Sequence, residues 1–168
     1  MNTKNKTYRL VIRGILTAII ILQTMVPFLG FIPIGITSLT IIHVTVIIAA
    51  IVLGTKDGMF FGLIITVFTN PIISVLPRVL VGLVAGVLFT WLYRKTKKVV
   101  VASIVAAIFG TLTNTVLVLT LMGTLYTHLV ATTYGVDASV LFVTLGAIAL
   151  TNGVSEVITA VILTPILA

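Results

Sequence analysis

Long apolar runs, separated by short polar turns, make up most of this chain. A helix needs roughly 20 apolar residues to cross the hydrocarbon core of a bilayer. A transmembrane β-barrel would instead show alternating apolar and polar residues in segments of about ten. The runs are continuous, so the pattern predicts an all-α fold, a single transmembrane domain over residues 1–168 with six membrane-spanning helices. The expected spans are Leu10–Leu29, Ile41–Leu53, Gly58–Phe68, Pro77–Tyr93, Val99–Met122 and Ala138–Leu167.

The connections between these spans differ in character. Gly54–Gly58 (GTKDG) and Arg94–Lys98 (RKTKK) read as polar turns, whereas Gly30–Thr40 reads as an apolar loop. Pro77 is expected to break the chain and to open the fourth span, because proline is tolerated in the first turn of a helix. The stretch from 58 to 93 is shorter than the roughly 40 residues that two full spans need. Either the third span is short, or a segment is missing from the chain.

Composition and charge fit a membrane protein and oppose a water-soluble one. The chain is 60% hydrophobic and only 8% charged, and its mean hydropathy is +1.34. In a six-span arrangement the basic residues fall on the side that holds both termini, with Arg78 as the exception. Cytoplasmic loops carry the excess of Lys and Arg in membrane proteins. Both termini are therefore predicted to be cytoplasmic, and the basic charge needs no nucleic acid to explain it.

Polar residues inside the apolar spans are the candidates for a binding site, because ionisable groups in the hydrocarbon region are costly. Arg78 lies near the outer end of the fourth span, and Glu156 lies inside the sixth. Asn152 precedes Glu156 by four residues and shares its helix face. Asn114 lies in the outer half of the fifth span, and His128 lies in the outer loop. These residues either form a polar binding pocket or a structural knot, for example an Arg78–Glu156 ion pair.

Other features are weaker or negative. His43 and Gln23 are lesser candidates, and His43 is expected at the outer interface. Pairs of small residues four apart, Gly58 with Gly62 and Gly82 with Gly86, predict close helix packing. The chain has no P-loop motif, no HExxH motif, no GxSxG motif and no cysteine. We therefore expect no catalytic residues, no metal site and no enzymatic activity in this chain.

The chain resembles the substrate-binding S components of energy-coupling factor (ECF) vitamin transporters. The resemblance covers essentially the whole chain, including the basic amino end that leads into RGILTAII. The runs IIHVTVIIAAIVLGTKDG and FTNPIISVLPRVLVGLVAG resemble the pantothenate-type or hydroxymethylpyrimidine-type branch. The resemblance implies a multi-pass protein of the bacterial plasma membrane that binds a water-soluble vitamin at its outer side. Its implied partners are a transmembrane coupling subunit and two cytosolic ATPases, which would hold ATP and Mg, so no cofactor is expected here.

The resemblance also implies roles for individual residues. Gly14 and Ala18 match the small-residue motif of the first span that docks on the coupling subunit, although the family usually has Ala at both positions. Outer-half residues of spans four to six build the family's pocket, which implicates Arg78, Asn114, Asn152 and Glu156 here. A lone Arg suits a carboxylate, which favours pantothenate over the pyrimidine alcohol.

Three other functions stay open on the sequence. A stand-alone secondary transporter would use a proton on Glu156. A structural or regulatory membrane subunit would bind no ligand. A small membrane enzyme is the third alternative, although no catalytic set is visible.

Overall fold

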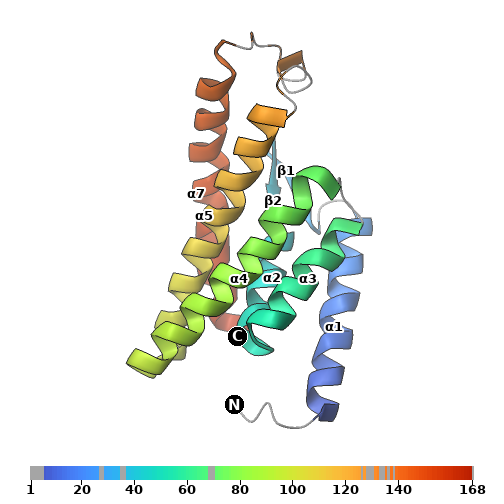
Figure 1. Cartoon of the computed structure of the whole chain (residues 1–168), viewed down its shortest axis with the longest axis vertical. Coiled ribbons are helices and arrows are strands. Elements are labelled where there is room, and N and C mark those ends of the chain that lie inside the picture. Colours follow the sequence, from blue (N-terminus) through green and yellow to red (C-terminus); the bar gives the residue numbers. More distant parts are fainter. Residues whose placement is uncertain are drawn as a thin grey trace.

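Six helices and a β-hairpin make up the described part of this computed structural model (Figure 1). The structure describes residues 6–26, 29–34, 37–67, 71–125, 127, 131–132, 135, 137 and 139–167. The helices are α1 (Lys6–Met25), α2 (Ile42–Val52), α3 (Thr55–Val67), α4 (Pro71–Thr96), α5 (Val99–Leu125) and α7 (Leu141–Leu167). The strands are β1 (Phe31–Ile34) and β2 (Thr37–Thr40).

The predicted all-α membrane fold is confirmed, and the helices fall into two length classes. Four described segments are long and apolar enough to cross a membrane: α1, Val75–Thr96 within α4, α5 and α7. The helices α2 and α3 have 11 and 13 residues, so they rise only about 16 and 20 Å. The helix α3 is therefore short, which is one of the two alternatives that the spacing of the turns left open.

The helix α2 forms the centre of the bundle. Nine consecutive residues, Ile42–Ala50, are buried, so neighbours surround this helix on every side. A helix that is hydrophobic on every face is typical of such a buried position. It packs against α1, α3, α4, α5 and α7, and its side chains form the main core with Ile20, Phe61 and Val81.

The helices α3 and α4 pack with their backbones in close approach. A Cβ on Gly82 would clash with the backbone of Gly58, and one on Gly62 would clash with the backbone of Arg78. Small residues allow this approach, as the spacing of the glycines predicted. Because these helices touch so closely, the start of α4 and its Arg78 are held firmly against α3.

Two predictions about backbone structure are wrong. Pro77 does not begin the fourth span: α4 begins six residues earlier, at Pro71, and Pro77 lies buried inside it. A membrane helix tolerates an internal proline because neighbouring groups can satisfy the freed carbonyl. The segment expected as a loop before α2 is an antiparallel hairpin in which Phe31 pairs with Thr40 and Ile34 with Thr37.

An ionic cluster ties α1 to the bundle. The Asp57 carboxylate, expected in an exposed polar turn, is buried in the first turn of α3. It accepts hydrogen bonds from Arg9 Nη2 and, at 2.6 and 2.9 Å, from Arg13 Nη2 and Nε. Arg9 also donates to the carbonyl of Leu53 at 3.2 Å. The turn between α2 and α3 is tight because Gly54 adopts a φ of +108°, which only glycine takes readily.

Both ends of the described chain and one basic turn lie at the same end of the bundle. In Figure 1, α5 and α7 lie side by side, α1 forms the opposite edge, and the start of α1 lies at the same end as the close of α7. The turn between α4 and α5 lies at that end too, and it carries the basic run 94–98. We call this the basic end; the hairpin lies toward the other end.

Candidate functional site

Four of the predicted site residues line one small cavity in the half of the bundle away from the basic end. Arg78 comes from α4, Asn114 from α5, and Asn152 and Glu156 from α7. The cavity measures about 170 Å³. The remaining lining residues are Thr40 of the hairpin and Thr115, Val118, Leu119, Met122 and Ile148. Residues far apart in the sequence thus meet as one polar pocket with an apolar wall.

Arg78 is the cation of this cavity. Its residue is only 6% exposed, and its Nη1 donates a 2.6 Å hydrogen bond to Asn114 Oδ1. Its Nε is buried and has no hydrogen-bond partner. A buried guanidinium carries five N–H donors, and leaving one unpaired is costly. Arg78 can therefore donate a further hydrogen bond to an acceptor on a ligand.

Glu156 is held by neutral donors. Its Oε1 accepts a 2.9 Å hydrogen bond from the backbone N–H of Thr40, and its Oε2 accepts one of 3.2 Å from the Thr115 hydroxyl. Among the described residues, the ion pairs within 4 Å are those of Asp57 with Arg9 and Arg13. Arg78 and Glu156 therefore line the same cavity without forming the direct ion pair that was considered as the structural alternative.

Two polar lining residues, Thr40 and Thr115, did not stand out in the sequence, and His43, which does not line the cavity, was misplaced. Thr40 and Thr115 were missed because threonines are common in this chain and their hydroxyls usually bond to their own helix. His43, expected at the outer interface, is fully buried in α2. Its Nε2 lies 3.1 Å from Thr111 Oγ1, and the single hydroxyl proton of Thr115 is shared between the Thr111 carbonyl and Glu156. His43 thus buttresses the polar wall that holds Glu156.

The other candidates lie elsewhere. Gly14 and Ala18 are exposed on α1, and a Cβ added at Gly14 would meet nothing within 4 Å. Gln23 accepts a 2.8 Å hydrogen bond from Thr45 between α1 and α2, away from the cavity. His128 lies outside the described residues. The face of α1 with Gly14 and Ala18 is thus open, as the docking prediction requires.

Known proteins that resemble this chain are transporters. The chain is 39% identical to the "Pantothenate transporter PanT" of Leuconostoc mesenteroides, over 55% of this chain and 56% of that protein. It is 34% identical to the "Pantothenic acid transporter PanT" of Lactococcus lactis subsp. cremoris, over 74% of this chain and 73% of that protein. The match therefore spans little more than half the length of the first relative and about three quarters of the second.

The family is shown by a match over nearly the whole chain. The family model described as "ECF transporter, substrate-specific component" matches residues 8–168. The matched region contains every described helix apart from the first two residues of α1. With four helices able to cross a membrane, this chain is a multi-pass membrane protein that belongs to the substrate-specific components of ECF transporters.

Proposed function

We propose that this chain is the substrate-binding subunit of an ECF importer and that it binds pantothenate in the cavity between Arg78 and Glu156. The family places the chain among substrate-specific components, and both relatives carry pantothenate in their names. The cavity supplies the chemistry for this substrate: pantothenate has a carboxylate at one end and hydroxyls and an amide along its length.

The observation that carries the proposal is that the Arg78 guanidinium is buried and only partly hydrogen-bonded. It is buried in a cavity, it lacks a carboxylate partner among the described residues, and its Nε has no acceptor. A ligand carboxylate would supply the missing acceptor and neutralise the charge. Charge-assisted hydrogen bonds of this kind are roughly twice as strong as neutral ones. An anionic substrate is therefore favoured over a neutral one.

The other residues of the cavity suit the hydroxyl and amide groups of pantothenate. Glu156 can accept hydrogen bonds from the ligand's hydroxyls, and amide side chains such as Asn152 offer both donors and acceptors. None of the described residues that line the cavity is aromatic, so these residues offer a pyrimidine ring no stacking partner. This favours pantothenate over hydroxymethylpyrimidine as the substrate.

The transport step would need partners. This chain contains no P-loop motif, so ATP hydrolysis would fall to two cytosolic ATPases joined through a transmembrane coupling subunit. The exposed small residues Gly14 and Ala18 of α1 offer a smooth face on which the coupling subunit could dock. The isolated chain should then bind the vitamin but not move it across a membrane.

Calorimetric titration of the purified chain in detergent tests the proposal. We expect saturable pantothenate binding that Arg78→Ala weakens by about 100-fold, since hydrogen bonds to charged groups contribute about 1.5–3 kcal/mol each. The matched control is Lys98→Ala, which removes an exposed basic residue far from the cavity and should leave affinity unchanged.

Three outcomes would contradict the proposal. Equal binding by wild type and Arg78→Ala would remove Arg78 from the site. Binding of hydroxymethylpyrimidine without pantothenate would keep the family and replace the substrate. Pantothenate flux in liposomes that contain only this chain would instead favour the stand-alone secondary transporter.

A further inference from the structure

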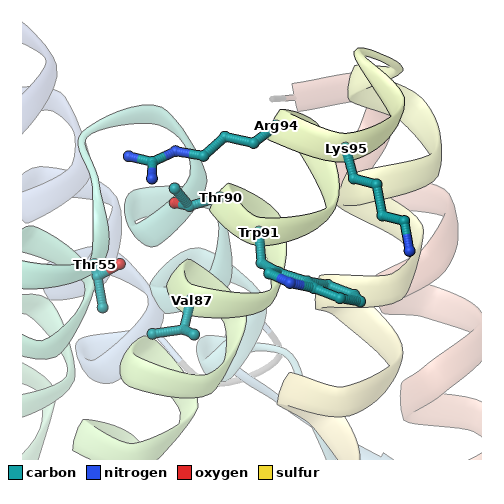
Figure 2. Close-up of a pocket in the computed structure, with 6 residues that line it drawn as sticks. All are labelled: Thr55, Val87, Thr90, Trp91, Arg94 and Lys95. Carbon is teal, nitrogen blue, oxygen red and sulfur yellow. The ribbon is translucent and has the colours of Figure 1, made fainter.

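A second cavity lies at the basic end, where α4 closes and α3 begins. It measures about 570 Å³ and is lined by Thr55, Val87, Thr90, Trp91, Arg94 and Lys95 (Figure 2). It shares no residue with the pantothenate site proposed above. From its lining we propose that this cavity binds the headgroup of an anionic phospholipid, with an acyl chain lying along α4.

The first argument is the order of side chains along α4. Val87, Trp91 and Lys95 follow one another at intervals of four residues, so they share one helix face. Val87 is 51% exposed and Trp91 is 59% exposed, and Lys95 is exposed at the end. Over about 12 Å this face passes from apolar to aromatic to cationic. A lipid leaflet changes in the same order, from acyl chain through glycerol to phosphate.

The second argument is uncompensated positive charge. Asp57 pairs with Arg9 and Arg13, and Glu156 bonds to Thr40 and Thr115. Across the described residues, neither Arg94 nor Lys95 makes an ion pair with a side-chain carboxylate within 4 Å. Figure 2 shows Arg94 extending over the Thr55 side of the cavity, while Lys95 lies along Trp91 on the other side. The two charged groups thus lie on opposite sides of Thr90 and Trp91 in the cavity lining, and neither is paired with a carboxylate of the described residues.

The third argument is the position of Trp91. The Lys95 ammonium lies 5.5 Å from the centroid of the indole ring, close enough for a cation–π interaction. Tryptophan is enriched where a membrane helix meets the headgroups. Basic pockets beside helix ends bind anionic headgroups in membrane proteins. A lipid fits this face better than a protein partner does, because Val87 and Trp91 are exposed where a membrane helix meets acyl chains and headgroups.

The chain contains a single tryptophan, so its fluorescence reports on this cavity alone. We would place the full-length protein in bilayers that contain phosphatidylglycerol or phosphatidylcholine with brominated acyl chains, which quench indole on contact. We expect brominated phosphatidylglycerol to quench Trp91 at a lower mole fraction than brominated phosphatidylcholine does. Each basic side chain that lines the cavity should change the relative affinity about fivefold.

The variants separate a defined site from general surface charge. Arg94→Gln and Lys95→Gln should each reduce the preference for phosphatidylglycerol about fivefold. Lys98→Gln removes the same charge from an exposed residue outside the cavity, and should leave the preference intact. An equal loss in all three variants would overturn the site in favour of diffuse attraction.

Two further results would also overturn the proposal. Equal quenching of the wild-type protein by the two brominated lipids would show that the cavity does not select an anionic headgroup. A saturable change in Trp91 emission on adding inorganic phosphate to the protein in neutral detergent would make a soluble phosphate the occupant. Neither result depends on pantothenate, so the lipid site and the vitamin site can fail separately.

Discussion

Two opposite charges share one small cavity without touching, and each is held by a neutral neighbour. Asn114 accepts from Arg78, while Thr40 and Thr115 donate to Glu156. In a direct ion pair, Arg78 and Glu156 would satisfy each other and would be less able to bind a ligand. The separated arrangement keeps a donor at one end of the cavity and an acceptor at the other. A substrate with an anionic end and hydroxyls can use both.

This arrangement makes a prediction about Glu156. Glu156→Ala should weaken pantothenate binding about tenfold or more, because it removes an acceptor for ligand hydroxyls and the partner of the Thr40 N–H. Glu156→Gln keeps an acceptor oxygen for Thr40 and should bind more tightly than the alanine variant. Calorimetric titration measures both. Thr159→Val is the control, since its hydroxyl bonds only within α7, to the Ser155 carbonyl. An alanine variant that binds like wild type would remove Glu156 from the site.

Among individual residues, the sequence identifies the charged members of the cavity better than it identifies the hydroxyl-bearing ones. Arg78 and Glu156 stand out because ionisable groups are rare in apolar spans, and the structure brings both to one cavity. Thr40 and Thr115 do not stand out, because their role depends on which helices meet. The burial of Asp57 was missed because the run GTKDG reads as a polar turn. Nothing in this run indicates that Arg9 and Arg13 of α1 bind the Asp57 carboxylate.

Among the elements, α1 is the most loosely covered. Only Leu16 and Ile20 are buried along it. Its polar ties are the bonds of Arg9 and Arg13 to Asp57 and of Arg9 to the Leu53 carbonyl at the basic end, and the bond between Thr45 and Gln23 near the other end. Because these bonds are few, each one matters for the position of α1. Asp57 accepts most of them.

Asp57→Asn tests that dependence. The substitution removes the countercharge of Arg9 and Arg13, and we expect it to destabilise the fold. The arginine side chains are 38% and 45% exposed, whereas that of Asp57 is 9% exposed. The loss should thus fall between the roughly 1 kcal/mol of an exposed pair and the about 3–5 kcal/mol of a buried one. Thermal unfolding in detergent measures it. Asp137→Asn, the same change in an exposed loop residue, should have no effect; equal melting of both variants would contradict the prediction.

Element boundaries show where sequence patterns reach their limit. The start of α5 matches the prediction because a basic run precedes it, and α2 starts one residue after its predicted start. The hairpin was missed because glycine and proline in 30–40 favoured a loop, although β-branched residues around a glycine are also a hairpin signal. Pro77 was misplaced because burial among neighbouring helices can hold a proline inside a helix.

For the whole molecule, the open face of α1 is the surface available to a coupling subunit. Gly14→Leu adds a large side chain where a Cβ has no neighbour within 4 Å, so it should leave folding and pantothenate binding unchanged. It should weaken co-purification with the coupling subunit, because close approach of helices needs small residues. Gly146→Leu is the matched control, since Gly146 also faces open space, on α7. Normal assembly of Gly14→Leu would show that the subunit docks elsewhere.

The central position of α2 has a consequence for biosynthesis. Of the described helices that pack against it, only α1 precedes it in the chain; α3, α4, α5 and α7 follow, so the ribosome delivers α2 before most of the helices that enclose it. Until α5 emerges, the imidazole of His43 lacks its partner Thr111. Until α7 emerges, Val44 and Ile48 lack Ala160, which belongs to their apolar cluster. A chain that stops before α7 would leave this centre incomplete. Quality-control proteases of the membrane could recognise such a truncated product by its exposed centre.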